Sequence, residues 1–244
     1  MRIDMTVVMM VLLGGMVVMA QDTMEKDVIK TSAGELEITF IGHGSIMMAF
    51  GGKIIQVDPY GRLADYSKFP KADWVLLTHD HPDHLDPVAL RSVRTPNTVV
   101  VLPPICADKV TGGTVMTNGE VRTVLGIKVE AVAAYNLVHK RDKGPVFHPR
   151  GEGNGYVLTF GDKRIYVAGD TENTPEMKAL KQIDCAFLPM NLPYTMTPEM
   201  VADAAKAFKP KILYPYHYGD TNPAKFAALL KDAPDIEVRI RKMK

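Results

Sequence analysis

Three of the seven histidines in the sequence lie within a six-residue segment that also holds two aspartates. His79 and His81 are two positions apart, so at the end of a strand their side chains point to the same side. Pro82 then turns the chain, and this turn brings Asp83 and His84 back toward the same pocket. Imidazole nitrogens and carboxylate oxygens are typical zinc ligands, and burying so many of them without a cation would be costly. The segment therefore predicts a site for a divalent metal ion.

A mostly apolar strand before this cluster and a helix after it are the elements that must position these side chains. Residues Asp73–Thr78 are typical of a strand in the interior of a sheet, and Asp86-Pro87 begins a helix with an N-cap and a proline at the first helical position. Three more pairs of this kind predict helix starts: Thr174-Pro175, Thr197-Pro198 and Asn222-Pro223. The other predicted strands are Glu35–Ile41, Ile46–Phe50, Lys53–Val57, Thr98–Leu102, Val121–Leu125, Ile127–Ala134, Tyr156–Phe160, Arg164–Ala168, Ile183–Pro189, Lys211–Tyr216 and Ile236–Ile240. This order of elements predicts two sheets covered by helices, in one domain.

The composition of the 244-residue chain excludes several classes of protein. With 46% hydrophobic and 23% charged residues, the chain is neither disordered nor a protein with many membrane spans. Its 29 basic and 28 acidic side chains give a formal net charge of +1, so nucleic acid is not an expected partner. The two cysteines, Cys106 and Cys185, are too few for a disulfide scaffold. Since Cys185 lies in a predicted buried strand, free thiols are favoured over a bridge between the two.

The first 20 residues differ in kind from the rest of the chain. Arg2 precedes an uncharged run of 15 residues, Met5–Met19, and Val18-Met19-Ala20 places small or branched residues where a signal peptidase cuts. The run is short for a membrane span, which needs about 20 apolar residues. We therefore expect residues 1–20 to be a cleaved signal peptide and residues 21–244 to be periplasmic or secreted, without a stable membrane span. An uncleaved membrane anchor is the alternative.

One long segment, Asn136–Gly155, has no predicted helix or strand. Loops of this length in compact domains are commonly functional. Four basic and two acidic side chains give this segment a local charge of +2. It is either a solvated surface loop or a flap over the active site that meets an anionic group. Its glycine-rich end, Gly151–Gly155, precedes a strand and is interpreted as a flexible hinge rather than a nucleotide-binding loop.

Together with the histidine cluster, three more motifs resemble those of the metallo-β-lactamase superfamily. Val57-Asp58-Pro59 looks like the early strand-ending aspartate of that family, which supports the metal-binding loop. Gly169-Asp170-Thr171 looks like its Gly-Asp-Thr element, and Leu213–Gly219 looks like its last strand, which ends in a histidine ligand. The four elements occur in the family's order over most of the mature chain. The resemblance is to small, single-domain metal-dependent hydrolases similar to ascorbate-phosphate lactonases, and it implies an α+β fold, a four-layer αββα sandwich.

The resemblance also implies a metal site for one or two divalent ions, with zinc as the first choice and manganese as the alternative. The implied ligands are His79, His81, Asp83, His84, Asp170 and His217. The first two would hold one ion, Asp83, His84 and His217 would hold the second, and Asp170 would bridge them. The family's isolated central histidine is replaced by Asn136. Either Asn136 lies at or near the metal, or His148 comes in from the flap as a ligand or a substrate contact.

These residues imply a metal-dependent hydrolase in which a metal-activated hydroxide attacks an ester, lactone or similar bond. Asp83 is the expected catalytic residue, since its carboxylate can orient the nucleophile and then protonate the leaving group. The expected partner is a small molecule, and the basic flap favours an anionic one. A phosphodiesterase or phospholipase-type hydrolase is one alternative, and a non-catalytic metal-binding protein is another. His43, on the first predicted hairpin, either contacts substrate in the cleft or is an ordinary turn residue.

Overall fold

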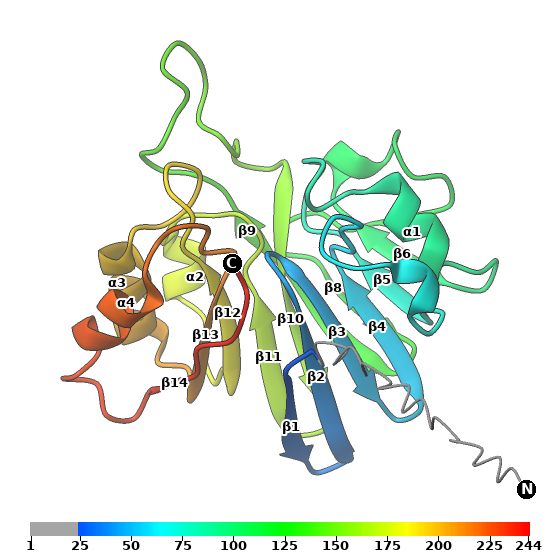
Figure 1. Ribbon diagram of the computed structural model, residues 1–244, viewed down its shortest axis with the longest axis horizontal. Helices are drawn as coiled ribbons and strands as arrows, with labels where there is room; N and C mark the ends of the chain where they lie inside the picture. Colours follow the sequence, from blue (N-terminus) through cyan, green and yellow to red (C-terminus); the bar gives the residue numbers. More distant parts are fainter. Residues whose placement is uncertain (1–23) are drawn as a thin grey trace, which may run out of the picture.

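Two mixed sheets that pack against each other form the centre of the computed structural model, which describes residues 24–244 (Figure 1). The predicted signal peptide, residues 1–20, lies outside the described residues. Strand order is β1-β2-β3-β4-β5-β6-β7 in the first sheet and β14-β13-β12-β11-β10-β9-β8 in the second. The first sheet contains β1 (Lys26–Thr31), β2 (Gly34–Gly42), β3 (Ser45–Phe50), β4 (Lys53–Val57), β5 (Trp74–Leu76), β6 (Val99–Leu102) and β7 (Thr114–Val115). The second contains β8 (Val121–Val124), β9 (Ile127–Ala134), β10 (Gly153–Phe160), β11 (Lys163–Val167), β12 (Cys185–Pro189), β13 (Ile212–Tyr216) and β14 (Glu237–Val238).

Helices cover the outer face of each sheet, which gives the predicted four-layer αββα sandwich (Figure 1). Helix α1 (Pro87–Val93) packs on the first sheet, with the short 3-10 helices η1 (Tyr66–Lys68) and η2 (Pro104–Cys106). Helices α2 (Pro175–Lys178), α3 (Pro198–Phe208) and α4 (Pro223–Leu229) cover the second sheet. None of the helices in residues 24–244 has the length and apolar character needed to cross a membrane. The α+β prediction is confirmed.

All four α-helices in the described part of the chain begin at the predicted pairs of a capping residue and a proline. Asp86 accepts hydrogen bonds from the backbone amides of Val88 and Ala89, and Pro87 occupies the first helical position. The caps of the other three helices, Thr174, Thr197 and Asn222, accept equivalent bonds. Such caps satisfy backbone donors that a helix leaves unpaired at its N-terminus, so a short helix can form at a defined residue.

The core between the sheets consists of the alternate side chains that each strand directs inward. Leu36, Ile38 and Phe40 of β2 are buried on this side, and β9 contributes a similar alternating set. The ring of Phe40 lies 5.1 Å from the ring of Tyr214 on β13, and Tyr214 stacks on Phe187 of β12 at 4.9 Å. These contacts fix how the first sheet lies on the second, and the functional residues come from both sheets.

The structure corrects the predicted hinge at Gly151–Gly155. Gly153 and Gly155 belong to β10 and pair with Ala134 and Val132 of β9. A Cβ atom on Gly155 would lie 2.6 Å from the carbonyl oxygen of Ala168, so glycine is required there for close approach of the backbones rather than for flexibility. The rest of the flap contains an isolated bridge between Lys140 and Val146 and projects from the body (Figure 1).

Both cysteines are buried and free in the structure. Cys106 ends η2 in the outer layer of the first sheet, whereas Cys185 begins β12 in the core between the sheets. Burial raises the pKa of each thiol to about 12, so neither is a thiolate near neutral pH.

Candidate metal centre

The predicted ligands come together where strands of both sheets end. His79, His81, Asp83 and His84 follow β5 in the first sheet, whereas Asp170 follows β11 and His217 follows β13 in the second. His43 lies on the turn between β2 and β3, and His148 lies at the end of the flap, shortly before β10. Segments far apart in the sequence therefore contribute imidazole and carboxylate groups to one place.

A first group consists of His79, His81 and His148, whose ligand atoms lie within 4.8 Å of one another. The Nε2 atom of His148 is 3.2 Å from Nδ1 of His81. The ring centroids of His79 and His148 are 5.0 Å apart. Three imidazoles this close together can hold one metal ion.

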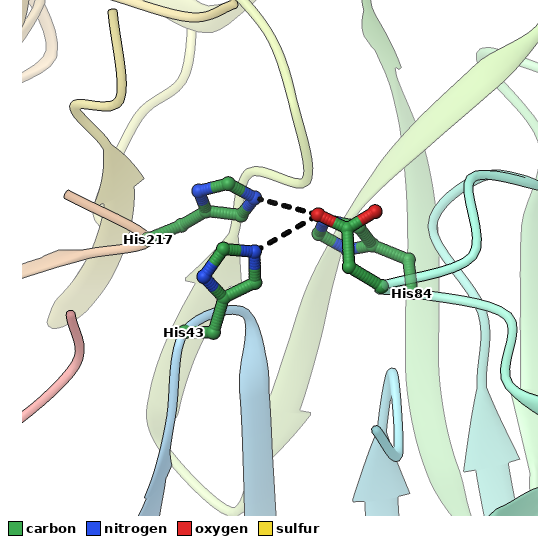
Figure 2. A group of neighbouring side chains, drawn as sticks. His43, His84 and His217 are labelled. Atoms are coloured by element: carbon green, nitrogen blue, oxygen red, sulfur yellow. Dashed lines mark hydrogen bonds and ion pairs between the residues drawn. The ribbon is translucent and has the colours of Figure 1, made fainter. Parts of the chain in front are cut away.

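A second group consists of His43, Asp83, His84 and His217 (Figure 2). Asp83 Oδ2 lies 2.9 Å from Nε2 of His43 and 3.7 Å from Nε2 of His217. Figure 2 shows that the labelled rings of His43 and His217 both point to one carboxylate oxygen. The Nε2 atom of His84 is 3.9 Å from the same oxygen. The rings of His43 and His217 pack together, with their centroids 3.6 Å apart.

Asp170 lies between the two groups. Its Oδ2 atom is 3.4 Å from Nε2 of His148 in the first group and 3.5 Å from Nε2 of His217 in the second. Its Oδ1 atom is 3.5 Å from Nε2 of His84. The Asp170 side chain is 4% exposed, so its charge is largely withdrawn from water. This position is compatible with a carboxylate that bridges two cations.

Hydrogen bonds on the outer side of the cluster orient two of the imidazoles. Asp58 Oδ2 accepts hydrogen bonds from the hydroxyl of Thr78 and from Nδ1 of His84, at 2.5 and 2.8 Å. Because the Thr78 hydroxyl donates to Asp58, its oxygen is left to accept from Nδ1 of His79, at 3.0 Å. Nδ1 of both histidines therefore carries a proton, and Nε2 is the nitrogen that faces the centre.

Asn136 performs the same role for His148. Its Oδ1 atom accepts hydrogen bonds from the backbone amide and from Nδ1 of His148, at 2.8 and 2.7 Å. Its Nδ2 atom donates to Glu172 Oε1 at 3.1 Å and to the carbonyl oxygen of Tyr194 at 2.8 Å. All of its side-chain hydrogen-bonding groups are thus occupied, so Asn136 lies behind His148 and is not placed as a ligand. Of the two sequence-based alternatives, the geometry favours His148.

Glu172 is a functional residue that the sequence analysis missed. Its carboxylate is fully buried and accepts hydrogen bonds from the backbone amides of Leu137, Val138 and His139, at 2.7 to 2.8 Å. Glu172 therefore fixes the base of the flap, and through Asn136 it fixes His148. The available signal was its place directly after Asp170-Thr171, where a third buried polar side chain needs partners.

Several buried polar atoms of the cluster have no hydrogen-bond partner in the described part of the chain. They include Nε2 of His79, His84 and His217, and Oδ1 of Asp170. Leaving such atoms buried and unpaired is costly unless another group binds them. Because the set combines imidazole nitrogens with a carboxylate oxygen, the residues fit a divalent transition metal ion such as zinc.

The pKa values in the cluster agree with this donor set. Burial lowers the pKa of His148 to about 4 and that of His79 well below its ordinary value, so both rings are neutral at pH 7 and offer a lone pair. Burial also opposes the charged form of His84, but the carboxylates of Asp170 and Asp58 outweigh it and raise the pKa of His84 to about 9. A cation that binds Nε2 of His84 must therefore displace a proton.

A cavity of about 410 Å³ opens over the cluster. Its floor includes His81, Asp83, His148, Asp170 and His217, whereas Arg141 and Phe147 of the flap, with Asn191 and Tyr194 of the β12–α3 loop, form its walls. A second hollow beyond Asp83 is lined by His43, Tyr60 and Arg62. The volume of the first cavity is that of a small-molecule site.

His43 lies on a turn, and its ring is within hydrogen-bonding distance of Asp83. Its backbone lies in the left-handed region, at φ 50°, and its carbonyl oxygen accepts a hydrogen bond from the amide of His217. The next residue, Gly44, has no room for a side chain, because a Cβ atom would lie 2.7 Å from Cε1 of His84. This turn therefore packs directly against two of the candidate ligands.

Comparison with known proteins places the chain in a family. A model described as a β-lactamase superfamily domain matches residues 37–217, which include the first and last predicted ligands, His79 and His217. A UPF0173 metal-dependent hydrolase of Pelotomaculum thermopropionicum is 32% identical over 221 residues, which are 84% of this chain and 96% of that protein.

Solved structures agree with the sequence comparison. A protein from Parabacteroides distasonis that is described as a metal-dependent hydrolase is 51% identical, with a TM-score of 0.86, and the match covers 91% of this chain and 100% of that chain. The metallo hydrolase Igni18 of Ignicoccus hospitalis is 23% identical and shares the fold, with a TM-score of 0.70 and coverage of 85% of this chain and 95% of that chain. The chain belongs to the metallo-β-lactamase superfamily, as its sequence motifs predicted.

Proposed function

We propose that this chain is a metal-dependent hydrolase that cleaves an ester, lactone or similar bond in a small molecule. The similar proteins described as metal-dependent hydrolases support the general activity. The observation that carries the proposal is the position of Asp83. Its side chain is 31% exposed and lines both hollows, while its Oδ2 atom faces His43 and His217. A carboxylate that both touches the candidate metal ligands and reaches the substrate cavity can act on a water molecule and on a leaving group.

The residues of the chain divide the work as follows. His79, His81 and His148 would hold one ion, His84, His217 and Asp83 would hold a second, and Asp170 would lie between them. A bound divalent ion such as zinc polarises a carbonyl or phosphoryl oxygen and makes water more acidic. Although burial opposes it, hydrogen bonding to His217 and His43 lowers the pKa of Asp83 well below its usual range. Asp83 is therefore ionised, as a proton acceptor must be. In the proposed reaction it would take a proton from the attacking water and give that proton to the leaving group.

The charges that line the cavity favour an anionic substrate, but they do not distinguish between an ester, a lactone and a phosphodiester as the bond that is cleaved. Arg141 lines the same cavity as the histidine and aspartate cluster. An anionic ester or lactone and a phosphodiester both satisfy this feature, so a phosphodiesterase or phospholipase-type activity is the second candidate. The exposed edge of Asp83 argues against a non-catalytic metal-binding protein, because a purely structural site is closed to substrate.

The test combines metal analysis with a substrate panel. The protein is loaded with zinc or manganese, its metal content is measured, and hydrolysis of 4-nitrophenyl acetate, a γ-lactone and bis(4-nitrophenyl) phosphate is followed. Asp83→Asn should lower turnover on the cleaved substrate by about 10²–10⁴-fold while most metal is retained. Asp80→Asn is the matched control, since Asp80 is bonded to Lys109 instead of lying in the metal cluster. Near-normal turnover by metal-loaded Asp83→Asn would contradict the proposed mechanism.

We also propose that the protein is exported, on the strength of the short apolar run and the Val18-Met19-Ala20 motif in the sequence. Expression of the full chain in a bacterium with a periplasm, followed by N-terminal sequencing of the periplasmic protein, should give Gln21 as the first residue. Recovery in the cytoplasm of a soluble protein that retains Met1 would contradict export.

A further inference from the structure

Four of the exposed large hydrophobic side chains belong to the two segments that form the cavity walls, the flap and the β12–α3 loop. Leu137 and Val138, at the base of the flap, are 47% and 65% exposed, and Leu192 and Tyr194, in the β12–α3 loop, are 44% and 46% exposed. We call these four residues the apolar rim. Single exposed apolar side chains are ordinary, whereas a group of them beside a ligand cavity marks a binding surface.

The apolar rim continues into the cavity through two aromatic rings. Phe147 and Tyr194 both line the cavity and meet edge to face, with ring centroids 5.0 Å apart. Asn136 holds the flap base against the same loop by donating to the carbonyl oxygen of Tyr194. The two segments that carry the apolar rim are therefore held together, and both supply an aromatic ring to the wall above the metal centre.

One positive charge faces this surface. Arg141 is the only lysine or arginine among the described residues that line the cavity, and its guanidinium lies 5.4 Å from the centre of the Phe147 ring. It donates a hydrogen bond to the carbonyl oxygen of Val146, and no carboxylate in residues 24–244 pairs with it. The remaining guanidinium donors can bind an oxyanion.

We propose that the substrate is an amphiphilic anion. Its apolar chain or ring lies on the apolar rim and against Phe147 and Tyr194, and its oxyanion group, a carboxylate, sulfonate or phosphate, binds Arg141. This inference rests on the proposed function for the identity of the cleaved bond, but the recognition surface itself does not depend on turnover.

A matched pair of fluorescent probes separates the two parts of this surface. 8-Anilinonaphthalene-1-sulfonate is an amphiphilic anion, and N-phenyl-1-naphthylamine is its uncharged counterpart. The metal-loaded protein should bind one molecule of the sulfonate in a saturable manner, and more tightly than the uncharged amine. Arg141→Gln should weaken sulfonate binding about tenfold and leave amine binding unchanged. Arg141→Lys, which keeps the charge, should lose less.

Variants of the rim and of distant positions complete the test. The double variant Leu137→Ser, Val138→Ser should weaken the binding of both probes, because it removes apolar surface that both use. Lys143→Gln, a flap cation outside the cavity lining, and Val88→Ser, an exposed apolar side chain on α1, should change neither. Equal loss of sulfonate affinity in Arg141→Gln and Lys143→Gln would overturn the specific role of Arg141.

The outcomes distinguish this inference from the proposed function. Ester hydrolysis without saturable binding of either probe would overturn the inference and leave the hydrolase activity standing. Probe binding as predicted, with no hydrolysis of any substrate in the panel, would support the inference and contradict the proposed function. Two results would assign the rim to a different occupant and overturn the inference: binding to phosphatidylglycerol vesicles without binding of free probe, or a concentration-dependent dimer that excludes the probes.

Discussion

Replacement of Asn136 by alanine tests whether the metal centre depends on a residue that does not touch the metal. Asn136 is 4% exposed, and its side chain makes four hydrogen bonds, two from His148 and two to Glu172 and Tyr194. The net contribution of a typical hydrogen bond is about 0.5–1.5 kcal/mol, so Asn136→Ala should lower the free energy of unfolding by about 2–6 kcal/mol. Without the Asn136 oxygen that accepts the hydrogen bond from Nδ1 of His148, the affinity for the first metal ion should also fall about 10–100-fold.

Two measurements and two further variants make this prediction specific. Urea unfolding gives the change in stability, and competition with a chromophoric chelator gives the affinity of each ion. Asn136→Asp keeps an oxygen for His148 but turns an acceptor toward Glu172, so it should lose stability and retain more metal affinity than Asn136→Ala. Asn173→Ala removes one surface hydrogen bond, to Asp203, and should change either quantity little. If Asn136→Ala binds both ions with wild-type affinity, the assignment of His148 as a ligand positioned by Asn136 is wrong.

Three further predictions concern the supports of the site and of the fold. Gly44→Ala should displace the ring of His84 and reduce the binding of the second ion, because the new methyl group would lie 2.7 Å from the ring. Native mass spectrometry measures the metal content, and an unchanged content would contradict this prediction. Burial raises the pKa of Asp27, but hydrogen bonds from a tyrosine and from arginines outweigh burial and hold this pKa below its ordinary value. Asp27 therefore stabilises the fold above about pH 4, and this contribution is lost as the pH falls through the native pKa. Asp27→Asn should therefore be less stable than wild type in urea at pH 7 and differ less at pH 3; a constant difference would refute the assignment. Met243 is fully buried in the core between the sheets, so Met243→Ala should lower the free energy of unfolding by about 2–5 kcal/mol. Urea unfolding measures this change, and an unchanged free energy would contradict the prediction.

Local chemistry explains which parts of the fold were predictable. Each α-helix in residues 24–244 begins with a capping residue followed by proline, and such a pair acts within one turn, so the sequence alone indicates it. Strand β1 was not predicted, because its sequence alternates weakly and Ile29 is its only buried residue. It exists because β2 offers it a hydrogen-bonding edge along its full length. The hinge assigned to Gly151–Gly155 was wrong for a similar reason, since the close approach of β9 and β11 to β10 decides its structure.

The candidate site shows the same division between local and distant information. The segment from His79 to His84 is dense in ligand types, so its chemistry was evident from spacing. His148 had no such signal, because it follows a segment without regular structure and meets His81 across 67 residues. Glu172 was missed because three of its partners are backbone amides of the flap, and backbone donors leave no trace in a sequence pattern.

Because the candidate ligands come from both sheets, a bound metal ion would connect the two sheets. Each of the two groups combines imidazoles from both sheets, since His148 and His217 adjoin strands of the second sheet and the other histidines adjoin strands of the first. The packing of Phe40 on Tyr214 fixes how the sheets lie on each other. A bound ion is then a cross-link between the sheets, and an ion present at 100 times its dissociation constant adds about 2.7 kcal/mol of stability. The affinity for metal should in turn report the alignment of the sheets. A core substitution such as Phe40→Leu, which leaves every ligand in place, would be detected first as a weaker metal site.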